Sequence, residues 1–106
     1  MIVNVLEEKK GENIVLLDIK EISYFADYFV ICSGTSERML KALHEAVAEQ
    51  VKADFSIRAR LEGQPSDGWL LADYGDVLVH VFSPEQRDYY QLEALWSEAK
   101  VLLHVQ

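Results

Sequence analysis

Hydrophobic and polar positions along the chain change their period several times, which divides the chain into expected strands and helices. Residues 13–19 form a nearly continuous apolar run of strand length, which is typical of a strand buried on both faces, and residues 27–32 form a second β-rich run. Apolar residues then recur at helical spacing as far as about Ala53, which predicts a long helix with Thr35 or Ser36 as its N-cap.

The remaining elements follow from local signals. A short helix is expected over residues 3–10, and residues 55–61 should include a short strand. Residues 62–68 form the clearest loop in the chain. A final helix should begin with Ser83 as N-cap and Pro84 in the favoured first position, and its apolar stripe predicts that it continues to the end of the chain.

The order helix–strand–strand–helix–strand–strand–strand–helix predicts an α/β fold, with a mixed sheet of about five strands flanked by helices. A chain of 106 residues is long enough for one core, so we expect a single domain over residues 1–106. One cysteine excludes an internal disulfide and a cysteine-based zinc site. Because the sequence shows neither a secretory signal nor a membrane-length apolar run, we expect a soluble, cytoplasmic protein.

Residues 68–82 predict a β-hairpin, which is the most informative part of the chain. We expect its two-residue turn at Tyr74 and Gly75, because glycine supplies the positive φ that a tight turn needs. The register that follows pairs Asp73 with Asp76, Leu71 with Leu78 and Trp69 with His80.

Side chains of the hairpin alternate between two faces. The expected core face consists of Leu70, Ala72, Tyr74, Val77, Val79 and Val81. The mixed face consists of Trp69, Leu71, Asp73, Asp76, Leu78, His80 and Phe82. This mixture is typical of a binding surface, because tryptophan buries a large area with few rotatable bonds. The alternative is that the tryptophan packs beneath a helix and that the two aspartates cap the turn.

Charge favours a basic partner for this chain. Two carboxylates that face each other destabilise a sheet, and a lysine or arginine from a partner would relieve their repulsion. The net charge of −8 argues against contact with a nucleic-acid backbone and favours attraction to a basic protein. Acidity that serves solubility alone is the alternative explanation.

Catalytic signals are weak. The turn Ser33–Ser36 at a strand-to-helix junction is a candidate phosphate site, but it lacks the lysine and the glycines of a P-loop. Asp73 and Asp76 lie across a turn, and His80 is roughly 13 Å further along its strand, which makes a shared metal site geometrically poor. Cys32 is expected to be an inert buried thiol. We therefore expect no catalytic residue, metal or cofactor, with a nucleotide-binding, nucleotidyltransferase-like enzyme that uses Ser33–Ser36 as the alternative hypothesis.

Four segments in series resemble the iojap-like ribosomal silencing factors (RsfS). They are DYFVICSGTSER at residues 27–38, the pair Glu62–Gly63, WLLADYGDVLVHVF at residues 69–82 and RDYYQLEALW at residues 87–96. The resemblance spans about residues 3–98 in matching order and spacing.

The resemblance implies a fold like a reduced nucleotidyltransferase without the catalytic acids of that superfamily, and a non-enzymatic role. It implies binding to large-subunit ribosomal protein fourteen, a basic protein on the surface where the ribosomal subunits join. Occupying that position would block docking of the small subunit and repress translation. A role in large-subunit maturation and a homodimeric state are also implied.

The partner-binding tryptophan of the family matches Trp69. The residues that we expect to bind the partner are Trp69, Leu71, Asp73, Tyr74, Asp76, Leu78 and His80. The tryptophan and the two leucines should be apolar anchors, and the aspartates should pair with basic side chains. The histidine should border the patch, and the tyrosine should be a secondary contact. The chain departs from the family in its short segment before Gly11 and in residues 100–106, whose apolar side chains should cover the core or a second subunit.

Overall fold

The computed structural model describes residues 1–90 and 98–105. Its elements are α1 (Ile2–Glu8), β1 (Glu12–Asp18), β2 (Tyr28–Ser33), α2 (Glu37–Phe55), β3 (Arg60–Gln64), the 3₁₀ helix η1 (Pro65–Asp67), β4 (Trp69–Asp73), β5 (Val77–Phe82), α3 (Pro84–Tyr90) and β6 (Lys100–Val105). The described strands form one six-stranded sheet in the order β3-β4-β5-β2-β1-β6. Only β2 and β5 pair in parallel among these neighbours, so the predicted α/β fold with a mixed sheet is confirmed.

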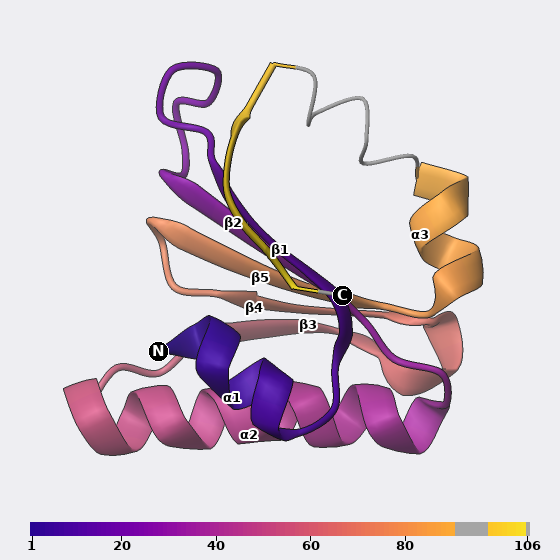
Figure 1. Ribbon diagram of the computed structural model, residues 1–106. Coiled ribbons are helices and arrows are strands. Elements are labelled where there is room, and N and C mark those ends of the chain that lie inside the picture. The colour runs from indigo at the N-terminus through magenta and orange to yellow at the C-terminus, as the bar shows by residue number, and fades with distance from the viewer. Residues whose placement is uncertain (91–97, 106) are drawn as a thin grey trace.

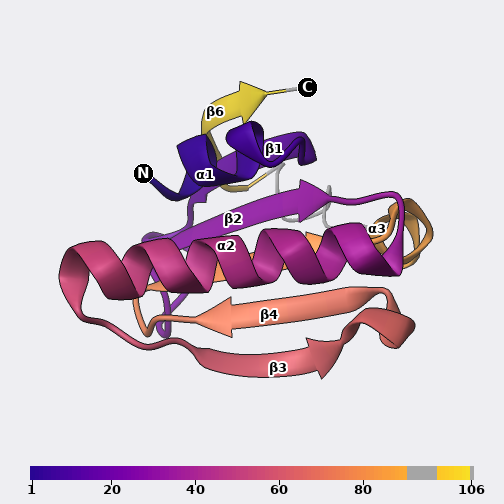
Figure 2. The ribbon, with the colours of Figure 1, turned by 90° about the horizontal axis from the view of Figure 1, so that it is seen from below.

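The sheet separates two apolar clusters. Helices α1 and α2 lie against one face, whereas α3 and the loop between β1 and β2 lie on the opposite side (Figure 1). Seen from below, α2 runs along the strands in the middle of the sheet and α1 lies over β1 (Figure 2). The cluster beneath the helices includes Leu6, Leu43 and Val81, each 0% exposed. The cluster on the opposite face includes Leu17 and Ile31, also 0% exposed.

Local signals placed the starts of α2 and α3 correctly. Ser36 is the N-cap of α2, because its Oγ accepts a hydrogen bond of 3.1 Å from Met39 N. Ser83 caps α3 in the same way through a bond of 3.2 Å from Gln86 N, with Pro84 as the first helical residue.

Two predicted boundaries were wrong. Residues 62–64, expected in a loop, belong to β3, because their backbone pairs with β4 and Gly63 adopts a φ of 89° that only glycine accepts without strain. The expected helix does not reach the end of the chain, because residues 100–105 form β6, which pairs antiparallel with β1. The part of that predicted stripe between residues 91 and 97 lies outside the described residues.

Candidate docking site

The turn between β4 and β5 lies one residue later than predicted. Tyr74 N donates a hydrogen bond of 2.9 Å to Val77 O, so Gly75 and Asp76 occupy the two central positions. Gly75 has a φ of 89°, and a type II′ turn takes its glycine at the first central position. The predicted register, which paired Asp73 with Asp76, is therefore wrong.

The corrected register preserves the predicted faces. Trp69 lies opposite Phe82, Leu71 opposite His80, and Asp73 opposite Leu78. Each cross-strand partner differs from the predicted one by two positions, and a shift of two residues keeps a side chain on the same side of the sheet. Six of the seven residues expected on the mixed face therefore share that face. The seventh, Asp76, lies in the turn.

The two aspartates do not face each other. Asp73 Oδ1 accepts a hydrogen bond of 2.8 Å from Gly75 N, and its neighbour on β3 is Arg60. Asp76 is exposed, and its carbonyl oxygen accepts hydrogen bonds from the backbone of residues 27 and 28. The cross-strand pair on which the predicted like-charge repulsion depended is therefore absent, and the capping role that was the alternative is correct for Asp73.

A stack of rings occupies the centre of the mixed face. Trp69 Nε1 donates a hydrogen bond of 3.2 Å to His80 Nδ1. The His80 ring is parallel to Phe82 within 3°, with centroids 5.7 Å apart, and meets the edge of Phe29 at 5.0 Å. We call Trp69, Leu71, Leu78, His80 and Phe82 the aromatic face.

Burial ranks the residues of the aromatic face. Leu71 and Leu78 are each 8% exposed and Phe82 is 3% exposed, so they have little surface to offer a partner. Trp69 and His80 are half-buried. The indole is therefore neither sealed in the core nor free in solvent. It rests on the cluster that contains the two leucines, with part of its surface accessible.

The Trp69 hydrogen bond fixes the protonation state of His80. An indole N–H can only donate, so His80 Nδ1 must be the acceptor and the imidazole proton must sit on Nε2. Within the described part of the chain, Nε2 is buried and has no hydrogen-bond partner. Burial lowers the pKa of His80 from 6.5 to about 4, so the ring is neutral at physiological pH.

Stability should fall between pH 6.5 and pH 4 because of His80. The unfolded chain protonates this ring below about pH 6.5, whereas the folded chain does so only near pH 4, so each downward step in this window favours unfolding. Relative to His80→Gln, the wild type should lose about 2 kcal/mol of unfolding free energy between pH 7 and pH 4.5. Urea denaturation of both proteins across this range measures the difference, and parallel pH profiles would contradict the assignment.

Tyr74 does not belong to the aromatic face. Its side chain packs against the cluster beneath α1 and α2, on the opposite side of the sheet from Trp69. Burial raises the pKa of the Tyr74 phenol, whose oxygen is buried and has no hydrogen-bond partner among the described residues. The structure thus brings Trp69, Leu71, Asp73, Leu78 and His80 together and leaves Tyr74 apart.

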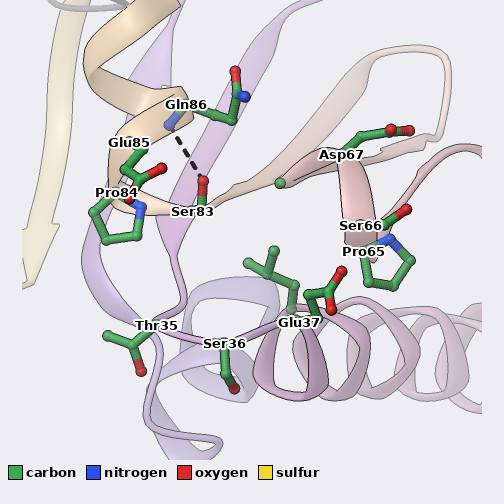
Figure 3. Close-up of a pocket in the computed structure, with 12 residues that line it drawn as sticks. Thr35, Ser36, Glu37, Pro65, Ser66, Asp67, Ser83, Pro84, Glu85 and Gln86 are labelled. Carbon is green, nitrogen blue, oxygen red and sulfur yellow. Dashed lines mark hydrogen bonds between the residues drawn. The ribbon is translucent and has the colours of Figure 1, made fainter.

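The structure argues against a phosphate site in the pocket beside Thr35 and Ser36. A pocket of about 560 Å³ lies beside the turn at residues 33–36, and residues from the starts of α2 and α3 and from η1 line it (Figure 3). Its described lining contains the carboxylates of Glu37, Asp67 and Glu85 but no lysine or arginine. Three carboxylates repel a polyphosphate, and the Ser36 hydroxyl oxygen already accepts the hydrogen bond that caps α2.

Other candidate chemistry is also weak in the described part of the molecule. Over residues 1–90 and 98–105, no three histidine, cysteine or acidic side chains converge as metal ligands. Cys32 is 0% exposed, and burial raises the pKa of its thiol to about 12, which disfavours the reactive thiolate. None of the described helices is long and apolar enough to cross a membrane.

Sequence reasoning missed the contribution of Phe29. This ring comes from β2, and it reaches His80 because β2 and β5 pair in parallel, with Phe29 beside Leu78. Strands far apart in the chain carry no local signal of such pairing. The apolar run 27–32 indicated a buried strand but not its neighbour.

Comparison with known proteins identifies the family. The family model described as "Ribosomal silencing factor during starvation" matches residues 1–106. "Ribosomal silencing factor RsfS" of Halalkalibacterium halodurans is 45% identical over 98 residues, which cover 92% of this chain and 83% of the relative. The protein of that name from Bacillus subtilis is 40% identical over 88% of this chain and 79% of its own length.

A solved structure agrees with these matches. The crystal structure of a Chromobacterium violaceum protein is 38% identical and superposes with a TM-score of 0.85 over 91% of this chain and 80% of that chain. The family consists of non-enzymatic, ribosome-binding factors. This chain belongs to the RsfS/iojap family of ribosomal silencing factors.

Proposed function

We propose that this protein represses translation by binding ribosomal protein fourteen of the large subunit and sterically preventing the small subunit from joining. The match of the whole chain to the ribosomal silencing factor family carries this proposal, since the family implies association with the large ribosomal subunit. No chemical step is needed. A body that measures 32 × 32 × 23 Å is a sufficient obstacle on a joining surface if it binds tightly.

The aromatic face is the proposed contact surface. Trp69 supplies accessible apolar area, and because its N–H is already bonded to His80 it enters an interface without an unsatisfied donor. Leu71 and Leu78 support the indole from below. Asp73 and Asp76 lie at the end of the hairpin, where we propose that they meet lysine or arginine side chains of the basic partner.

Binding to separated ribosomal subunits tests this function. The purified protein should sediment with isolated large subunits and not with small subunits. When it is bound first, it should lower the yield of joined ribosomes formed from the two subunits. Sedimentation with neither subunit, or with large subunits but without any effect on joining, would contradict the proposed function.

The double variant Asp73→Asn, Asp76→Asn separates charge from folding. Asparagine Oδ1 can still accept the hydrogen bond of the turn, so unfolding free energy should change by less than about 0.5 kcal/mol. Affinity for the large subunit should fall by about 3- to 10-fold and depend less on salt, because rim charge pairs contribute modestly. Titrations at two salt concentrations measure both effects, with the double variant Glu8→Gln, Glu49→Gln on the exposed surfaces of α1 and α2 as the control that removes the same number of charges. Equal losses in the variant and the control would indicate a general effect of net charge.

A homodimer in the cytoplasm and a role in large-subunit maturation complete the proposal. The edge strand β6 supports self-association, since Val101, Leu102 and Leu103 are 49%, 45% and 43% exposed. Antiparallel pairing of two such edges would bury these side chains in a symmetric contact. Sedimentation equilibrium of the purified protein determines the oligomeric state.

A further inference from the structure

The loop between β1 and β2, residues 19–27, exposes an aromatic pair. Tyr24 is fully exposed at 108% and Phe25 is 70% exposed, with Ile22 beside them at 38%. Single exposed apolar residues are ordinary, but adjacent large ones at the tip of one loop are typical of an interaction site. The loop projects on the side of the sheet opposite α1 and α2, which is also the side of the aromatic face (Figure 1).

Hydrogen bonds hold the tip of this loop in one conformation. Ser23 Oγ accepts hydrogen bonds from Phe25 N at 3.2 Å and from Ala26 N at 3.3 Å. The backbone of residues 22 and 23 donates to Ile19 O at 3.1 and 2.9 Å. Ile19 and Ala26 are only 2% and 4% exposed, so the loop packs these two side chains into the core and directs the aromatic pair outward.

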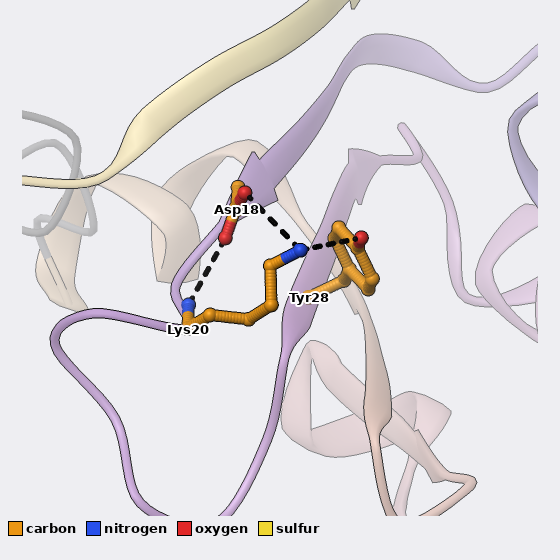
Figure 4. Close-up of polar contacts among 3 residues, drawn as sticks. All are labelled: Asp18, Lys20 and Tyr28. Carbon is orange, nitrogen blue, oxygen red and sulfur yellow. Dashed lines mark hydrogen bonds and ion pairs between the residues drawn. The ribbon is translucent and has the colours of Figure 1, made fainter.

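The base of the loop is tied on both sides. Lys20 Nζ donates a hydrogen bond of 3.1 Å to Tyr28 Oη and lies 3.7 Å from Asp18 Oδ2, while Lys20 N donates to Asp18 Oδ1 at 3.0 Å (Figure 4). Asp76 O accepts hydrogen bonds from Asp27 N at 2.8 Å and from Tyr28 N at 3.0 Å. The loop and the β4–β5 turn therefore form one connected end of the molecule. A surface that is ordered before binding loses less entropy when a partner docks.

Charge around the loop selects the partner. Glu21, Asp27 and Asp76 are exposed, and Lys20, the cation of this segment, is paired with Asp18. An aromatic pair bordered by carboxylates suits lysine and arginine side chains, which pair with the acids and stack on the rings. A hydrophobic or acidic partner would leave these carboxylates desolvated without compensation.

We propose that Tyr24 and Phe25 are a second arm of the docking surface and contact the same basic ribosomal protein as Trp69. This inference depends on the proposed function, because it assigns the loop to the same partner. The connection through Asp76 makes the loop continuous with the acidic turn of the proposed interface. Two separate apolar contacts with acids between them would fix the orientation of the bound protein as well as its affinity.

The double variant Tyr24→Ser, Phe25→Ser tests the inference. Affinity for isolated large subunits should fall about 10- to 100-fold, as expected for the loss of two aromatic contacts. The melting temperature should be unchanged, because neither side chain is buried. The conservative double variant Tyr24→Phe, Phe25→Tyr should bind within about twofold of the wild type, since the ring area is kept. Phe55→Ser is the control, because Phe55 is 59% exposed at the end of α2, in the layer beneath the sheet.

Parallel measurements separate this inference from the proposed function. If wild type binds large subunits and Trp69→Ala does not, but the double variant binds like the wild type, the loop is not part of the interface and the proposed function stands. If the double variant instead changes only the self-association of the free protein, the loop serves a second copy of this chain and the inference is overturned. If wild type does not bind large subunits at all, the proposed function itself fails.

Discussion

Replacing Trp69 with alanine is expected to lower affinity for the large ribosomal subunit by about 30- to 1,000-fold, which corresponds to about 2–4 kcal/mol for a binding hot spot. The physical reason is the loss of the accessible indole surface at the centre of the aromatic face. The fold should persist, because Trp69 is half-buried and the two main clusters of the core remain. We expect a stability cost of about 1–2 kcal/mol from the lost packing and the lost hydrogen bond to His80.

Matched substitutions make the Trp69 experiment specific. Trp69→Phe should retain more affinity than Trp69→Ala, because the N–H is satisfied within the protein and the partner contacts only apolar area. Phe55→Ala removes an exposed ring from the other layer and should bind normally. Circular dichroism and urea denaturation measure folding, and subunit titrations measure binding. Unfolding of Trp69→Ala at the assay temperature would show that Trp69 is a core residue. Normal binding of this variant would show that Trp69 is not part of the interface.

The faces of the hairpin could be predicted from the sequence although its turn could not. Either Tyr74–Gly75 or Gly75–Asp76 can form a two-residue turn around Gly75, and local sequence does not decide between them. The choice changes every cross-strand pair by two positions, so Trp69 and His80 stay on one face in both registers. The prediction failed for Asp73 and Asp76, because the position of the turn decides whether these two aspartates pair across the strands.

Long-range pairing explains the other errors. The run from Val101 to Val105 fits a helix or a strand equally well by periodicity. It forms β6 because its backbone pairs with the side of β1 that β2 does not occupy. The hydrogen bond from Trp69 to His80 links neighbouring strands diagonally, since Trp69 lies opposite Phe82 and Leu71 opposite His80. The β1–β6 pairing depends on the sheet order and the Trp69–His80 bond on the register of the hairpin, whereas the elements themselves follow from local pattern and capping.

Arg87 had no assigned role in the sequence, yet it links three elements. It is 6% exposed on α3, and its Nη1 donates hydrogen bonds to Asn13 O of β1 at 2.7 Å and to Ser33 Oγ of β2 at 2.8 Å. One guanidinium thus holds α3 against the beginning of β1 and the end of β2, which are neighbouring strands. A charged side chain can be buried at this position because protein acceptors replace the water molecules that would otherwise bind its N–H groups.

Replacing Arg87 with alanine is expected to lower the free energy of unfolding by about 2–4 kcal/mol, because a partly buried carbonyl and a buried hydroxyl both lose a charged donor. Arg87→Lys should recover only part of this loss, since an ammonium group lacks the planar fork of a guanidinium. Urea denaturation measures these changes, with Arg38→Ala on the exposed surface of α2 as the control. A double-mutant cycle with Ser33→Ala should give a coupling energy of about 1–3 kcal/mol. A coupling near zero would show that the hydroxyl contributes nothing to holding α3. Affinity of the folded Arg87→Ala fraction for large subunits should be unchanged, which separates this stabilising residue from the residues of the docking surface.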